Sequence, residues 1–227
     1  MSSSRHLVVT GASSGIGHAI AERALSEGWR VTGLSRRGEG PSSPSFTGIA
    51  CDLADANATL RTAERLTDVT AFVHSAGFMA TAPVADARHE DGEAMWRLHV
   101  GAAVQIAGSL APRLPAGGRI VLIGSRVGFG AAGRSQYAAV KAAQVGLARS
   151  WAAELVARQI TVNVVAPGAT DTPMLTAGSR AATPPRLPPI GRLIRPDEVA
   201  AAVTFLLSPA AAAITGQTLV ICGGASL

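Results

Sequence analysis

The sequence predicts an α/β protein with one doubly wound parallel sheet, and two patterns along the chain support that prediction. Short apolar runs rich in β-branched residues alternate with helical stretches from one end of the chain to the other. The runs are apolar throughout rather than at every second residue, which is typical of strands covered by helices on both faces. No linker interrupts the alternation, and 227 residues can bury one sizeable core. We therefore expect a single domain over residues 1–227.

The alternation assigns each element in order. The expected strands are residues 7–10, 30–34, 46–51, 69–74, 119–124, 161–166 and 218–221. The expected helices are residues 15–28, 55–66, 91–112, 135–158 and 196–208. Residues 176–190 form a long loop with several prolines. A loop of this length in a compact domain is usually functional, so we expect residues from about 172 to 195 to form a lid over a substrate.

The composition argues against membranes and nucleic acids as partners. The chain is 48% hydrophobic, yet no apolar run approaches the ~18 residues that a membrane helix needs, and none near the N-terminus suits a signal peptide. Its 20 basic residues are spread along the chain, and aromatic residues make up only 4%. Cys51 and Cys222 lie far apart and suit small buried residues of a reducing compartment. We expect a cytoplasmic protein with no metal site.

A glycine-rich turn follows the first expected strand and opens the first helix. Residues 10–17 read Thr-Gly-Ala-Ser-Ser-Gly-Ile-Gly. Glycines permit a tight turn, and the amides of a helix N-terminus favour an anion such as a pyrophosphate. This context indicates a dinucleotide-binding, Rossmann-type fold, although a purely structural turn would have the same pattern. The candidate cofactor-binding residues here are Gly11, Ser13, Ser14, Gly15, Ile16 and Gly17.

The end of the second expected strand bears on which dinucleotide binds. A fold that prefers NAD usually carries an acidic residue there, which binds the ribose 2′-hydroxyl. This chain has Arg36 and Arg37 instead, and arginine suits bidentate binding of a phosphate. NADP is therefore favoured over NAD. Two alternatives stay open: the two arginines are simply solvated, or the nearby Glu39 selects NAD.

The only tyrosine and the only lysine of the chain lie four residues apart on an expected helix. Tyr137 and Lys141 therefore project from one face, one turn apart. A nearby ammonium lowers the pKa of a phenol from about 10 toward neutrality, where the phenol can act as acid or base. The other 19 basic residues are all Arg, which indicates that Arg would not serve at position 141.

Together these motifs resemble the short-chain dehydrogenase/reductase family over essentially all 227 residues, and 3-oxoacyl reductase-like members most of all. Ser125, at the end of the fifth strand, matches the catalytic serine, and Tyr137 and Lys141 match the catalytic tyrosine and lysine. The resemblance implies hydride transfer between a nicotinamide cofactor and a carbonyl or secondary alcohol. In that chemistry Ser125 polarises the carbonyl and Tyr137 is the acid/base. Lys141 holds the nicotinamide ribose and lowers the pKa of Tyr137.

The resemblance also implies further cofactor contacts at three places. The first is a contact with the adenine after the third strand. The second is the place of an Asn-Asn-Ala-Gly motif after the fourth strand. The third is a Pro-Gly segment that holds the nicotinamide amide. The residues concerned are Asp52, Leu53, Ser75, Ala76, Gly77, Pro167, Gly168, Thr170 and Thr172.

The chain departs from the family pattern at two places. His99 stands where the family usually has an Asn that completes a catalytic tetrad and orders a water beside the lysine. An imidazole could keep or rewire that relay, or it could be an inert helix histidine. His74 and Ser75 replace both Asn of the fourth-strand motif, which puts local packing in doubt more than activity.

The substrate and the assembly are less determined by the sequence. Arg126 could bind an anionic substrate or face solvent. An NAD-dependent alcohol or diol dehydrogenase and a catalytically idle NADP-binding sensor or partner protein stay open as alternative functions. Weakly polar helix surface over residues 138–157 predicts a homo-oligomer, and the resemblance suggests a tetramer. The side chains expected to form an apolar substrate pocket are Phe78, Met79, Val127, Phe129, Met174 and Leu175.

Overall fold

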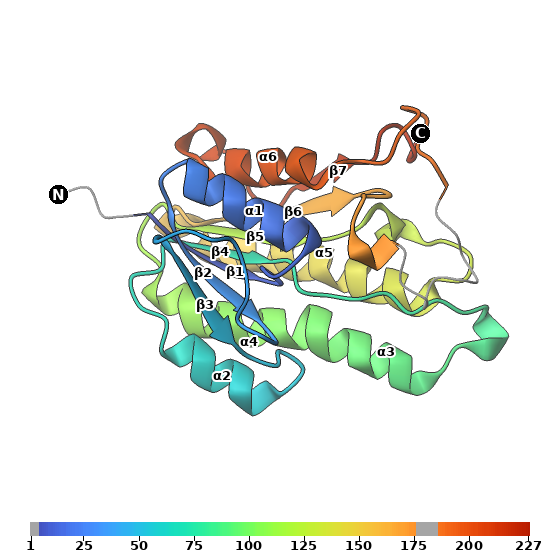
Figure 1. The fold of residues 1–227 in the computed structure, drawn as a ribbon, viewed down its shortest axis with the longest axis horizontal. Coiled ribbons are helices and arrows are strands. Elements are labelled where there is room, and N and C mark those ends of the chain that lie inside the picture. Colours follow the sequence, from blue (N-terminus) through green and yellow to red (C-terminus); the bar gives the residue numbers. More distant parts are fainter. Residues whose placement is uncertain (1–4, 176–185) are drawn as a thin grey trace.

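The computed structural model describes residues 5–175 and 186–227, and they form one seven-stranded parallel sheet with helices on both faces (Figure 1). The strand order is β3-β2-β1-β4-β5-β6-β7, so the chain moves outward from β1 in one direction, then returns to place β4 on the other side of β1. The strands are β1 (His6–Thr10), β2 (Arg30–Ser35), β3 (Phe46–Ala50), β4 (Ala71–His74), β5 (Arg119–Ile123), β6 (Thr161–Pro167) and β7 (Thr218–Ile221). The Rossmann-type fold class predicted from the sequence is confirmed.

The helices divide between the two faces of the sheet. Figure 1 shows α1 and α6 above the sheet and α2 and α4 below it, and α5 packs in the same core cluster as α4. The helices are α1 (Gly15–Ser26), α2 (Ala56–Glu64), α3 (His89–Trp96), α4 (Ala102–Leu110), α5 (Ser135–Leu155) and α6 (Pro196–Leu207). None of those described is long and apolar enough to cross a membrane.

Two hydrophobic cores lie against the two faces of the sheet. On β1, Val8 packs into the core under α4 and α5, whereas Leu7 and Val9 pack into the core under α1 and α6. Successive strand side chains point to opposite faces, so a strand buried on both faces is apolar at most positions rather than at every second one. This explains the continuous apolar runs that predicted the sheet.

One predicted helix differs from the structure. The stretch expected to be a single helix over residues 91–112 consists of α3, a π-helical turn η2 (Arg97–Gly101), and α4. A π turn widens the backbone locally and is often found at functional sites. His99 lies inside this turn.

The lid expected over residues 172–195 lies only partly within the described residues, because residues 176–185 fall outside them. On its N-terminal side, η6 (Pro173–Leu175) forms a short 3-10 turn. A parallel bridge between Thr170 and Ile194 brings the two ends of the segment together.

Candidate active site

A cleft of about 1230 Å³ opens at the carboxyl ends of the central strands. It is lined by the segments that follow β1, β4, β5 and β6, which is where open α/β sheets bind ligands. The cleft gathers every catalytic and cofactor-binding residue predicted from the sequence except Arg37. In the described parts of the chain, no group of three or more His, Cys, Asp or Glu side chains is placed to hold a metal ion.

At two positions the glycine turn has a backbone conformation that residues other than glycine adopt only with strain. Gly11 and Gly15 have φ values of +73° and +56°, in the left-handed region. A Cβ on Gly17 would lie 2.3 Å from the carbonyl oxygen of Gly11. The Ser14 side chain makes no capping hydrogen bond at the start of α1, so the first-turn amides have no side-chain acceptor there. The turn therefore fits the pyrophosphate of a dinucleotide.

His74 is fully satisfied in the neutral state, which resolves the doubt about its packing. Thr10 Oγ1 accepts hydrogen bonds from the backbone amides of Ser75 and Ala76, at 2.9 and 3.0 Å. The Thr10 hydroxyl proton is thus left to bond His74 Nδ1, 3.1 Å away, and His74 Nε2–H donates to the Leu98 carbonyl at 3.1 Å. Burial, reinforced by the charge of Lys141, lowers the pKa of His74 to about 3.

Tyr137 and Lys141 are buried side by side on α5, with Lys141 Nζ 5.7 Å from the centre of the Tyr137 ring. Ser125 follows β5, and its Oγ accepts a hydrogen bond from the Val127 amide at 3.2 Å. That bond uses a lone pair of the hydroxyl and leaves its proton for a group in the cleft. The three predicted catalytic side chains thus line one cleft.

The Lys141 ammonium has two acceptors from the protein. Its Nζ donates to the Ile123 carbonyl at 2.6 Å and to Gln144 Oε1 at 3.1 Å. Gln144 Nε2 in turn donates to the His99 carbonyl at 2.9 Å. Burial lowers the pKa of Lys141 to about 7. Gln144 was not among the residues predicted from the sequence, where its position one helical turn after Lys141 is the only signal that points to it.

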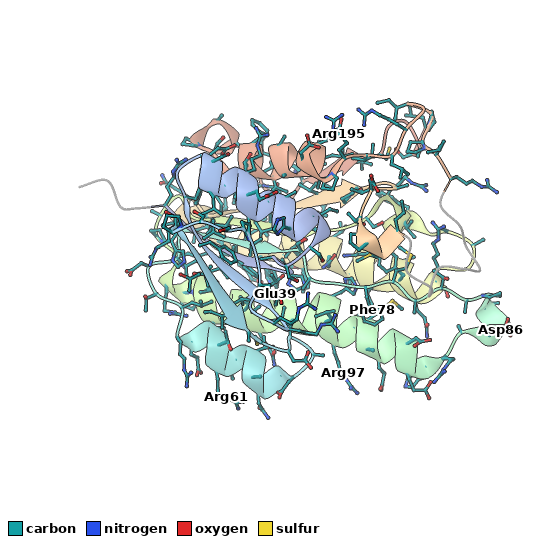
Figure 2. The ribbon with its side chains drawn as sticks, in the orientation of Figure 1. Glu39, Arg61, Phe78, Asp86, Arg97 and Arg195 are labelled. Atoms are coloured by element: carbon teal, nitrogen blue, oxygen red, sulfur yellow. The ribbon has the colours of Figure 1, made fainter. Side chains whose placement is uncertain are left out.

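The His99 side chain joins the π turn to the segment after β4. Its Nε2 lies 2.8 Å from the Phe78 carbonyl oxygen and 3.2 Å from the Phe78 amide nitrogen, and one tautomer can make only one of these bonds. The shorter contact favours Nε2–H donating to the carbonyl. The ring meets Tyr137 edge-on at 5.7 Å, and burial holds the pKa of His99 well below its usual value. Figure 2 shows Phe78 on the segment between β4 and α3.

Two predicted residues lie away from the cleft. The Arg37 guanidinium pairs with Glu39 at 2.7 Å, and both side chains are more than half exposed on the loop after β2 (Figure 2 labels Glu39). Arg36 lines the cleft, whereas Arg37 does not. Phe129 was expected in the substrate pocket but is 81% exposed and does not line the cleft. The other five pocket residues and Arg126 do line it.

Comparison with known proteins identifies the family. A family model described as Enoyl-(Acyl carrier protein) reductase matches residues 11–226. The chain is 35% identical to the 3-oxoacyl-(acyl-carrier-protein) reductase FabG of Vibrio harveyi, over 96% of this chain and 95% of that protein. The chain belongs to the short-chain dehydrogenase/reductase family. It is also 36% identical to carbonyl reductase family member 4 of Danio rerio, over 99% of both proteins. These relatives are named reductases, and the chain is accordingly an oxidoreductase of the short-chain dehydrogenase/reductase family.

Solved structures of family members agree with this membership. A short-chain dehydrogenase from Burkholderia cenocepacia J2315, in complex with NADP, has a TM-score of 0.87 at 32% identity and covers 98% of both chains. BdcA in complex with NADPH has a TM-score of 0.85 at 29% identity, over 97% of this chain and 93% of that one. The predicted resemblance to 3-oxoacyl reductase-like members is confirmed by the FabG relative and the family model.

The close packing of Gly77 against His99 gives a first prediction. A Cβ on Gly77 would lie 2.1 Å from Cε1 of His99, so the imidazole would have to move and lose its bond to Phe78. We expect Gly77→Ala to lower the free energy of unfolding by about 1–3 kcal/mol, measured by urea denaturation.

Gly108→Ala is the matched control for that measurement. Gly108 is an exposed residue of α4, and nothing lies within 4 Å of the position its Cβ would take. We expect this variant to gain about 0.5–1 kcal/mol of stability. A Gly77→Ala protein as stable as the wild type would show that the imidazole is not fixed by this contact.

Proposed function

We propose that the protein is an NADP-dependent oxidoreductase that transfers a hydride between the nicotinamide and a carbonyl or secondary alcohol. The observation that carries this proposal is that Ser125, Tyr137 and Lys141 line the same cleft as the glycine turn and Arg36. The relatives named as reductases and the similar structures named with NADP or NADPH support it.

The residues of the cleft divide into those that would hold the cofactor and those that would handle the substrate. The glycine turn and the N-terminus of α1 would hold the pyrophosphate, and Arg36 the 2′-phosphate. When bound, the cofactor supplies the hydride. The remaining residues proposed to contact it are Asp52, Leu53, Ser75, Ala76, Gly77, Pro167, Gly168, Thr170 and Thr172.

In the direction of reduction, the protein groups handle the carbonyl oxygen. Ser125 donates a hydrogen bond to that oxygen and so polarises the carbonyl. Tyr137 transfers its phenolic proton to the same oxygen as the hydride adds to the carbonyl carbon, which gives the alcohol. The ammonium of Lys141 stabilises the phenolate that Tyr137 becomes.

Two observations weigh against the alternative functions. An NAD-dependent enzyme would use an acidic residue after β2, but Glu39 is paired with Arg37 and does not line the cleft. A catalytically idle binding protein would have no use for a buried phenol beside a buried ammonium.

The charge of the cleft supports a substrate that carries an anionic group. Among the described residues that line it, Asp52 is the only acidic side chain, whereas Lys141 and four arginines are basic. Arg36 is assigned to the cofactor, which leaves Arg126, Arg134 and Arg186. Arg126 directly follows Ser125, and its Nε is buried without a hydrogen-bond partner among the described residues. With the apolar side chains Phe78, Met79, Val127, Met174 and Leu175 also lining the cleft, we propose a carbonyl compound with an apolar body and a carboxylate or phosphate.

We propose a cytoplasmic homo-oligomer, with a tetramer as the expected assembly. Exposed apolar side chains on and beside the helices of one face support an interface there, namely Trp96, Val104 and Val156. Size-exclusion chromatography coupled to light scattering measures the number of chains directly.

The acid/base role of Tyr137 gives the central test. We expect Tyr137→Phe to lower kcat by at least about 10²–10⁴-fold, because the proton donor is removed, while NADPH still binds. Steady-state reduction of a carbonyl panel and a fluorescence titration with NADPH measure the two effects. Turnover near the wild-type value in this variant would refute the assignment.

The two neighbouring arginines provide a matched test of cofactor choice. We expect Arg36→Gln to weaken NADPH binding about 10- to 100-fold and to leave NADH binding unchanged, because one charged partner of the 2′-phosphate is lost. Arg37→Gln should leave both affinities within about twofold, because Arg37 is held by Glu39 outside the cleft. Equal losses in the two variants, measured by fluorescence titration, would contradict the assignment to Arg36.

The anionic substrate class is tested with a 3-oxo carboxylic acid and its methyl ester. We expect Arg126→Gln to raise the KM for the acid about 10- to 100-fold and the KM for the ester less than about twofold. A wild-type enzyme that prefers the ester, or a variant that affects both compounds equally, would exclude Arg126 as the anion-binding group.

A further inference from the structure

Gln144 is a buried polar residue that the mechanism above leaves without a role. It lies on α5 three residues after Lys141, so both side chains project from one face of the helix. Its exposed fraction is 0%. A buried amide is costly unless its hydrogen bonds are made, and here both ends of the amide are used.

The two ends of that amide connect Lys141 to the π turn. Gln144 Oε1 accepts from the ammonium of Lys141 at 3.1 Å, and Gln144 Nε2 donates to the backbone carbonyl of His99 at 2.9 Å. The donor end can only face a carbonyl and the acceptor end can only face the ammonium, so the orientation of the amide is fixed. The His99 carbonyl is itself held, because the His99 side chain bonds the Phe78 carbonyl.

The ammonium depends on these neutral acceptors. Burial is the only cause of the lowered pKa of Lys141, and no carboxylate in the described parts of the chain offsets it. The titratable side chains that face Lys141 are Tyr137 on its own helix, His74 on β4 and His99 in the π turn, and both imidazoles are neutral through burial. Ile123 supplies the other protein acceptor, a backbone carbonyl that a side-chain substitution does not remove.

We propose that Gln144 is a positioning residue for catalysis, which holds the Lys141 ammonium in its protonated form and fixes it against the π turn through the His99 carbonyl. The resemblance implies an Asn at position 99 that orders a water beside the lysine, whereas here the Gln144 amide links the ammonium to the backbone of residue 99. The position occupied by His99 therefore contributes through its backbone carbonyl, and a side chain from α5 replaces the water. This inference rests on the proposed function, since it concerns the lysine of that site.

The test is the pH dependence of kcat for carbonyl reduction with NADPH. Loss of the ammonium at high pH should give an alkaline limb in the wild-type profile. We expect Gln144→Leu, which keeps the volume but removes the acceptor, to move this limb down by about one pH unit and to lower kcat at pH 8 about tenfold. Gln144→Glu keeps an acceptor for the ammonium, so its limb should lie at or above the wild-type position.

Gln136→Leu is the matched control, because Gln136 lies on the same helix, outside the cleft, and bonds the Arg88 carbonyl at 2.9 Å. It should leave the limb in place. An unmoved limb in a folded Gln144→Leu protein, or an equal shift in Gln136→Leu, would overturn the proposal. If circular dichroism shows that Gln144→Leu does not fold, a Gln144→Glu limb below that of the wild type would overturn it instead. A wild-type protein that reduces no carbonyl would count against the proposed function and not specifically against the role of Gln144.

Discussion

The site depends on one buried cation that no carboxylate in the described parts of the chain offsets. Lys141 lies at the junction of α5, β5 and the π turn, and its protein acceptors are the neutral oxygens of Ile123 and Gln144. Burying an ammonium is costly, and the cost appears as a pKa lowered to about 7. The two imidazoles near it, His74 and His99, are neutral, which avoids adding like charges to the same region. Because burial destabilises the Lys141 ammonium, the negative charge of a nearby phenolate would stabilise it strongly.

Much of this arrangement could be predicted from the sequence, because its causes are local. The central strands are largely apolar since both faces of the sheet are covered there, and the strand-turn-helix context of residues 10–17 specifies the cofactor end of the cleft. Tyr137 and Lys141 share a face because helical spacing requires it. These predictions rely on periodicity and spacing, which one sequence contains in full.

The features that could not be predicted depend on contacts between distant segments. A π turn inserts only a small shift into a helical pattern, so residues 91–112 look like one helix although Arg97–Gly101 is widened. Arg36 and Arg37 are adjacent and chemically identical, and only the folded structure shows that Arg36 lines the cleft whereas Arg37 pairs with Glu39 outside it. Gln144 resembles an exposed polar residue until α5 is packed against the π turn and its amide meets the His99 carbonyl. Phe129 is apolar and close to Ser125 in sequence, yet its side chain faces solvent.

The geometry around position 141 explains why a chain otherwise rich in arginine has its only lysine there. An ammonium has three donors, and Ile123 and Gln144 accept two of them, which leaves one for a ligand in the cleft. A guanidinium has five donors in a rigid plane, so the same pocket would leave several of them buried without acceptors. The number of acceptors therefore favours lysine at this position, since its positive charge alone would not distinguish it from the 19 arginines.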